Sequence, residues 1–101
     1  MRRATTPTHT FTFPQEIEVS TVEKTLITYS QCGKNVLEKT LEDLEVDTEN
    51  NMMSLQLTEA ETNLFAPGKA LIQVKAKVNG TSLASQMIGL PVKPVLDSKE
   101  I

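Results

Sequence analysis

His9 and Cys32 are the side chains best suited to nucleophilic chemistry or zinc binding, and each is the sole residue of its type. A cysteine nucleophile needs a base held beside it, and a zinc site needs three or four protein ligands. The sequence has no second histidine or cysteine to complete either arrangement. We therefore predict no catalytic residue, no cofactor-binding residue and no metal ligand, and we expect that the protein is not an enzyme.

A run of acidic residues is the next candidate for chemistry, because carboxylates bind calcium and can hydrolyse glycosides. Its members are Glu42, Asp43, Glu45, Asp47 and Glu49. The run lacks the glycine and the closing glutamate of an EF-hand loop. The sequence also has only 4% aromatic residues to form a sugar platform. We interpret the run as a solvated, negatively charged edge.

Basic residues in two places are candidate partner contacts. Residues 1–10 are polar and rich in threonine, which predicts a flexible arm that contacts a partner. Two lysines alternate on the polar face of a predicted hairpin, where they could hold an acidic partner; protection from edge pairing explains them equally well. The predicted partner contacts are Arg2, Arg3, His9, Lys75 and Lys77.

The predicted hairpin spans residues 69–92 and organises the rest of the chain. Asn79-Gly80 supplies the two positive φ angles of a type I′ turn, which sets the register of the flanking strands. On the apolar face this register pairs Val78 with Thr81, Ala76 with Leu83, Val74 with Ser85 and Ile72 with Met87. On the other face it pairs Lys77 with Ser82, Lys75 with Ala84, Gln73 with Gln86 and Leu71 with Ile88. Pro91 and Pro94 are predicted to end the pairing.

Alternation of apolar and polar residues predicts further strands over residues 10–13, 22–32 and 52–57, and a short edge strand over residues 16–19. Residues 35–46 fit two structures. Leu37 and Leu41 alternate as in a strand, whereas Asn35 and Glu38 have the spacing of a helical capping box.

Thr58 and Glu61 have the same capping-box spacing, which predicts a helical crossover near residues 58–65 that ends on a buried Phe65. Such a crossover between a strand and a long hairpin is typical of immunoglobulin-like sandwiches.

Length and charge limit the remaining classes of function. The 101 residues are enough for a single domain, predicted over residues 11–95, with a frayed tail at residues 96–101. A net charge of −3 argues against nucleic acid as a partner. The apolar runs are too short to span a membrane, and no apolar core of a signal peptide follows the first residues. The single cysteine is typical of a reducing compartment.

Four stretches carry a resemblance that covers nearly the whole chain: RRATTPTHTF, VEKTLITYSQCGKNVLEKT, LTEAETNLF and IQVKAKVNGTSLAS. Together they resemble a group of small phage and prophage-encoded proteins of gram-positive gut bacteria. The group looks like immunoglobulin-type β-sandwiches, distantly similar to the N-terminal domain of phage baseplate upper proteins. The resemblance supplies no catalytic motif, and it favours a strand for residues 35–46.

The expected fold is therefore all-β: an immunoglobulin-like antiparallel β-sandwich of about seven strands with one short helical crossover. The resemblance implies a non-enzymatic structural or assembly module of the phage tail or baseplate, in contact with other phage subunits or with copies of itself. The expected location is the host cytoplasm during assembly and then the virion. The alternative is a stand-alone phage-encoded binding protein that modulates a host protein or reads carbohydrate. An exposed aromatic pair that includes Tyr29 would favour carbohydrate.

Overall fold

The computed structural model describes residues 1–85 and 87–96, which form eight strands, one short α-helix and two 3-10 turns. The strands are β1 (Thr8–Thr12), β2 (Val22–Gln31), β3 (Lys34–Thr40), β4 (Glu45–Asp47), β5 (Met52–Gln56), β6 (Gly68–Val78), β7 (Thr81–Ala84) and β8 (Ile88–Val92). The helix α1 spans Glu59–Thr62, and the 3-10 turns are η1 (Val19–Thr21) and η2 (Leu41–Asp43).

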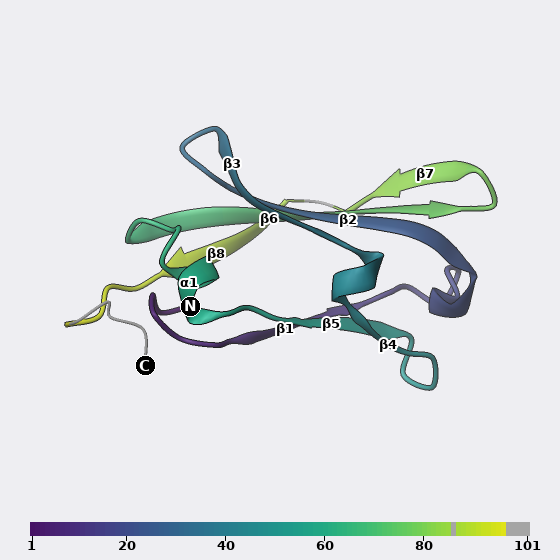
Figure 1. Cartoon of the computed structure of the whole chain (residues 1–101). Coiled ribbons are helices and arrows are strands. Elements are labelled where there is room, and N and C mark those ends of the chain that lie inside the picture. Colours follow the sequence, from purple (N-terminus) through teal and green to yellow (C-terminus); the bar gives the residue numbers. More distant parts are fainter. Residues whose placement is uncertain (86, 97–101) are drawn as a thin grey trace.

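The strands form two antiparallel sheets that face each other (Figure 1). The smaller sheet has three strands in the order β1-β5-β4. The larger sheet has five strands, in the order β3-β2-β6-β7, with β8 also paired to β6. The predicted all-β sandwich is confirmed. It has eight strands instead of about seven. The second half of the hairpin divides into β7 and β8, the predicted strand over residues 35–46 divides into β3 and β4, and no strand forms over residues 16–19.

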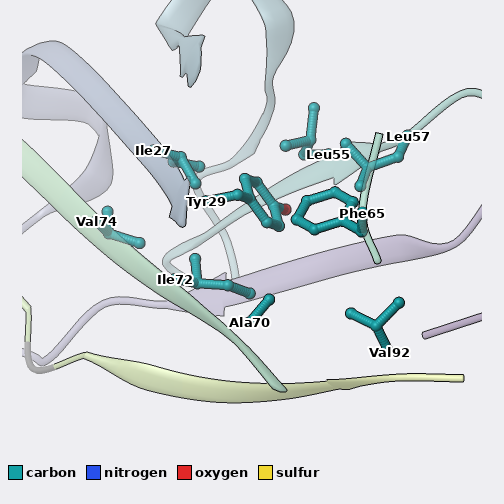
Figure 2. Close-up of a cluster of buried hydrophobic side chains, with 9 residues drawn as sticks. All are labelled: Ile27, Tyr29, Leu55, Leu57, Phe65, Ala70, Ile72, Val74 and Val92. Atoms are coloured by element: carbon teal, nitrogen blue, oxygen red, sulfur yellow. The ribbon is translucent and has the colours of Figure 1, made fainter. Parts of the chain in front are cut away.

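The core lies between the two sheets and is built from alternate residues of β2, β5 and β6. Figure 2 shows Tyr29 of β2 at its centre, with its ring edge-on to Phe65 at a centroid separation of 5.8 Å. The fully or nearly fully buried residues of this cluster are Ile27, Tyr29, Leu55, Leu57, Phe65, Ala70, Ile72, Val74 and Val92. Most of these side chains are aliphatic and lie on strands, where they alternate with more exposed residues. This alternation is the pattern that predicted the strands from the sequence.

The Asn79-Gly80 turn has the predicted conformation, with φ angles of 50° and 78°. The pairs Val78–Thr81 and Ala76–Leu83 on one face, and Lys77–Ser82 and Lys75–Ala84 on the other, are confirmed. The Gln73–Gln86 pair lies outside the described residues.

The register shifts by one residue after Ser85, and the predictions beyond that point were wrong. Ile72 pairs with Ile88 instead of Met87, and Leu71 pairs with Gly89 instead of Ile88. Ser85 donates its N–H to the Val74 carbonyl (2.8 Å). Its hydroxyl oxygen accepts the Val74 N–H at 2.9 Å. A side-chain oxygen thus replaces the backbone carbonyl of the ladder, and one extra residue is accommodated as in a β-bulge.

The shift turns the apolar residues of β8 toward the core, where Val92 is 4% exposed. Pro91 was expected to end the pairing, but it lies within β8 opposite Lys69. A proline is tolerated there because β8 is an edge strand, where an N–H is not always needed by a neighbour.

Residues 35–46 follow the strand alternative. β3 and β4 are joined by η2, and no α-helix forms among these residues. A capping box does occur, but between Thr40 and Asp43 at the start of η2. Residues 16–19 were expected to form an edge strand. They instead lead into η1, because the Asn51 side chain holds this loop away from strand geometry.

Residues 1–10 were predicted to form a separate flexible arm, whereas the structure places them against the sandwich. Thr8 already belongs to β1, and the Leu57 N–H donates to the Pro7 carbonyl (3.0 Å). Further upstream, the backbone N–H of Arg3 donates to the Lys93 carbonyl (3.2 Å), and the backbone N–H of Lys93 donates to the Met1 carbonyl (2.7 Å). The polar composition was misleading because backbone hydrogen bonds hold this segment, and they leave no hydrophobic pattern. The domain therefore begins before residue 11. The expected frayed tail lies outside the described residues, except for an exposed Leu96.

Candidate interaction surfaces

A group of lysines lies on the outer face of the larger sheet, where β2 and β6 run side by side. Lys24 is opposite Lys77, and Leu26 is opposite Lys75. The three lysines border a shallow hollow of about 300 Å³ that Thr40 and Ser82 also line. We call Lys24, Lys75 and Lys77 the lysine face.

The lysine face carries uncompensated charge. Within the described part of the chain the ion pair is Lys39 with Glu61, and no lysine of the lysine face takes part in one. Like charges directly opposite each other in an antiparallel pair are destabilising. An acidic group above the hollow would offset this repulsion.

The prediction for Lys75 and Lys77 placed them on the polar face of the hairpin, and the structure agrees. Lys24 was missed as a member of the site. Lys24 lies in β2. It is a neighbour of Lys77 only because β2 pairs with β6, a strand that is far away in the sequence. Only the alternation of β2 could have indicated that Lys24 and Leu26 share a face.

The other three predicted contacts lie elsewhere and are engaged within the chain. Arg2 Nη1 donates to the Pro94 carbonyl (3.1 Å), and Arg3 Nη2 donates to the Asn63 carbonyl (3.3 Å). His9 Nδ1 is 2.6 Å from the Tyr29 hydroxyl. None of the three borders the lysine hollow.

The contact between His9 and Tyr29 joins β1 of one sheet to β2 of the other. Burial lowers the pKa of His9, and the positive charge of the chain's amino group lowers it further. Burial also raises the pKa of Tyr29, and the negative charge of Glu61 adds to the rise. Both side chains are therefore neutral near pH 7, and their hydrogen bond holds the two layers together.

A second surface is an apolar hollow of about 310 Å³ on the side of the sandwich where β1 faces β7 and β8. We call this hollow the seam. Its apolar lining comprises Phe11, Phe13, Pro14, Ile17, Val74, Ala76, Leu83, Ala84 and Ile88. β1 is an edge of the smaller sheet, and β7 is an edge of the larger one. Leu83 is 39% exposed and Ile88 is 46% exposed, so two large apolar side chains meet solvent beside the seam.

Two of the residues considered for chemistry, Cys32 and Asp47, lie at turns. Cys32 is exposed and has a positive φ of 52° in the turn between β2 and β3. The Asp47 carboxylate accepts hydrogen bonds from Asn50 and from the Glu49 N–H, and those from Asn50 are the main cause of the lowered pKa of Asp47. Over residues 1–85 and 87–96, no group of three or more His, Cys, Asp or Glu side chains is arranged to hold a metal ion.

None of the helices in the described part of the chain is long and apolar enough to cross a membrane.

Comparison with known proteins adds no family assignment. A scan against protein-family models and a search of curated proteins each returned no match to this chain.

Proposed function

We propose that this protein is a non-enzymatic structural or assembly module of a phage or prophage particle, of the tail or baseplate type. It acts through protein–protein contacts with neighbouring subunits. The observation that carries the proposal is the seam, where Leu83 and Ile88 border an apolar hollow between two sheet edges. Exposed apolar residues gathered around a hollow are typical of protein interaction sites. The resemblance of the sequence to phage and prophage-encoded proteins supports the setting.

The lysine face adds a second reason to expect a protein partner. It places like charges opposite one another without a carboxylate from the described residues. A partner that supplies the carboxylates would gain Coulomb energy and would relieve the repulsion.

The alternative is a stand-alone binding protein. Reading of carbohydrate would need exposed aromatic rings, and Tyr29 is fully buried in the core with Phe65 against it. That position therefore supplies no sugar-stacking platform. Modulation of a host protein would use the same two surfaces and differs only in the partner.

Induction of the prophage in the source strain tests the proposal. Particles purified by density gradient are digested, and peptides of this chain are quantified by mass spectrometry against those of a known virion protein. We expect a fixed stoichiometric ratio. If the chain is abundant in the lysate but absent from the particles, the result would contradict the structural role and favour the host-modulator alternative.

A strain that carries L83S and I88S provides the matched variant. Both substitutions keep the backbone and make the rim of the seam polar. We expect the incorporated amount to fall at equal expression, whereas L64S, at another exposed apolar residue that does not line the seam, leaves it unchanged.

A further inference from the structure

The free edge of β7 runs between the seam and the lysine face. Successive residues of an edge strand direct their backbone groups alternately toward and away from the neighbouring strand. Ser85 directs its N–H to Val74 of β6, so Thr81 and Leu83, at the same spacing, also face β6. Ser82 and Ala84 therefore direct their N–H and C=O groups away from β6, to a side where no described strand pairs with them.

The side chains of β7 differ between its two faces. Leu83 lines the seam, together with apolar side chains of β1 and β6. Ser82 and Ala84 alternate with Leu83 and are paired directly opposite Lys77 and Lys75, although Ala84 also borders the seam. Because Ser82 and Ala84 are small, they leave the two lysines accessible from beyond the edge.

We propose that β7 accepts an extended segment of a partner subunit in which acidic and apolar side chains alternate. Such a segment pairs with the free backbone groups of Ser82 and Ala84, as in recognition by strand addition. Its apolar side chains enter the seam beside Leu83. Its carboxylates lie two strand spacings, or about 10 Å, from β6. That distance is within the combined reach of a glutamate and of Lys75 or Lys77.

Charge complementarity selects this edge over the others. β3, the opposite edge of the larger sheet, carries Lys39, which is already paired with Glu61, and a single further lysine, Lys34, at the first residue of the strand beside the turn. β4 carries the acidic residues Glu45 and Asp47, which would repel an acidic segment. β1 has only threonines on its outward positions and lacks a cationic neighbour of this kind. The inference deepens the proposed function and rests on it, because it names the edge and the chemistry of the partner segment.

Binding of a synthetic peptide to the intact protein tests the inference. The probe is a fluorescein-labelled peptide of alternating valine and glutamate, and a peptide of alternating valine and lysine is its control. Fluorescence anisotropy at low salt measures affinity, and amide spectra of the ¹⁵N-labelled protein locate the contact. We expect the acidic peptide alone to bind, with the largest amide shifts at Ser82 and Ala84.

Two sets of variants separate charge from backbone pairing. K75E/K77E should weaken binding about tenfold or more, whereas K34E/K93E makes the same change of net charge at exposed positions away from β7 and should have little effect. A84P removes one outward N–H without removing a bond to β6, and it should abolish binding while β7 stays paired.

Several results would overturn the inference. They are equal affinity for the two peptides, equal affinity of K75E/K77E and wild type, and amide shifts centred on β1. Dimerisation of the protein through β7 that excludes the peptide would assign the edge to a second copy and would also overturn it. If the peptide fails to bind while the chain is stoichiometric in particles, the inference fails and the proposed function stands. If the peptide binds and the chain is absent from particles, the edge assignment stands and the proposed function fails.

Discussion

Asn51 holds the loop between β1 and β2 through its side chain, and its replacement should destabilise the protein substantially. Its Nδ2 donates to the carbonyls of Phe13 (3.1 Å), Pro14 (3.1 Å) and Ile17 (2.8 Å). Its Oδ1 accepts the N–H of Val19 at 2.7 Å, and Val19 is only 3% exposed. Asn51 itself has a positive φ of 55°, a conformation that asparagine tolerates better than alanine does.

The expected magnitude follows from these contacts. Asn51→Ala leaves the Val19 N–H buried without a partner, which costs about 1–3 kcal/mol. Alanine in the left-handed region adds about 1 kcal/mol. The three carbonyls belong to residues that are exposed or half-buried, so we expect them to regain water and to add little. We expect a loss of about 3 kcal/mol in the free energy of unfolding.

Asn51→Gly separates the two terms, because glycine adopts positive φ without strain. It should cost about 2 kcal/mol, or about 1 kcal/mol less than alanine. Asn50→Ala is the matched control. Within residues 1–85 and 87–96, Asn50 bonds only to the turn carboxylate of Asp47, so its loss should cost no more than about 0.5 kcal/mol.

Urea unfolding followed by far-UV circular dichroism measures these differences, since the chain has no tryptophan. A common slope for all variants shows that the two-state treatment holds. A loss below about 1 kcal/mol for Asn51→Ala would refute the assigned role of the side chain. Equal stability of Asn51→Gly and wild type would show that the hydrogen bonds contribute nothing net.

Three further changes test other parts of the fold. Because the pKa of His9 is lowered in the folded state, the unfolded chain takes up a proton first as the pH falls below about 6.5. The neutral His9 therefore contributes fully to the stability of the fold above that pH, and its contribution is lost below it. Urea midpoints should decline from pH 8 to pH 5, and His9→Gln should flatten the decline. Gly80→Val should cost about 1 kcal/mol or more, because φ is 78° and no neighbour lies within 4 Å of an added Cβ, so the cost is of backbone origin; an unchanged thermal midpoint would contradict it. Deletion of residues 1–9 should lower stability by roughly 3 kcal/mol or more. It removes the His9 contact, the pairing of Thr8 and His9 with β5, three further backbone bonds and several bonds of Arg2, Arg3 and Thr5; a deletion variant as stable as the full chain would show that these residues form a separate arm.

Local patterns predicted the parts of the fold that local physics decides. The Asn79-Gly80 turn and its nearest pairs are confirmed, because a two-residue loop restricts the backbone and sets the register next to it. The Thr58–Glu61 capping box is also confirmed. Both features depend on residues within four positions of each other.

Features that depend on distant segments escaped prediction. The register shift at Ser85 arises because its hydroxyl finds the Val74 N–H, a contact that alternation does not encode. The first residues are held by backbone groups of β5, Leu57 and Lys93, which are far away in the sequence. A polar sequence of threonines gives no sign of such partners.

The sequence by itself determined the all-β class, the apolar face of β6 and the hairpin turn, because strand periodicity and turn conformation are local properties of the chain. Only the tertiary structure decided that Lys24 faces Lys77 and that the seam lies between β1 and β7. These surfaces arise where strands far apart in sequence come together. Their position depends on how the two sheets pack and which strands are left at the edges.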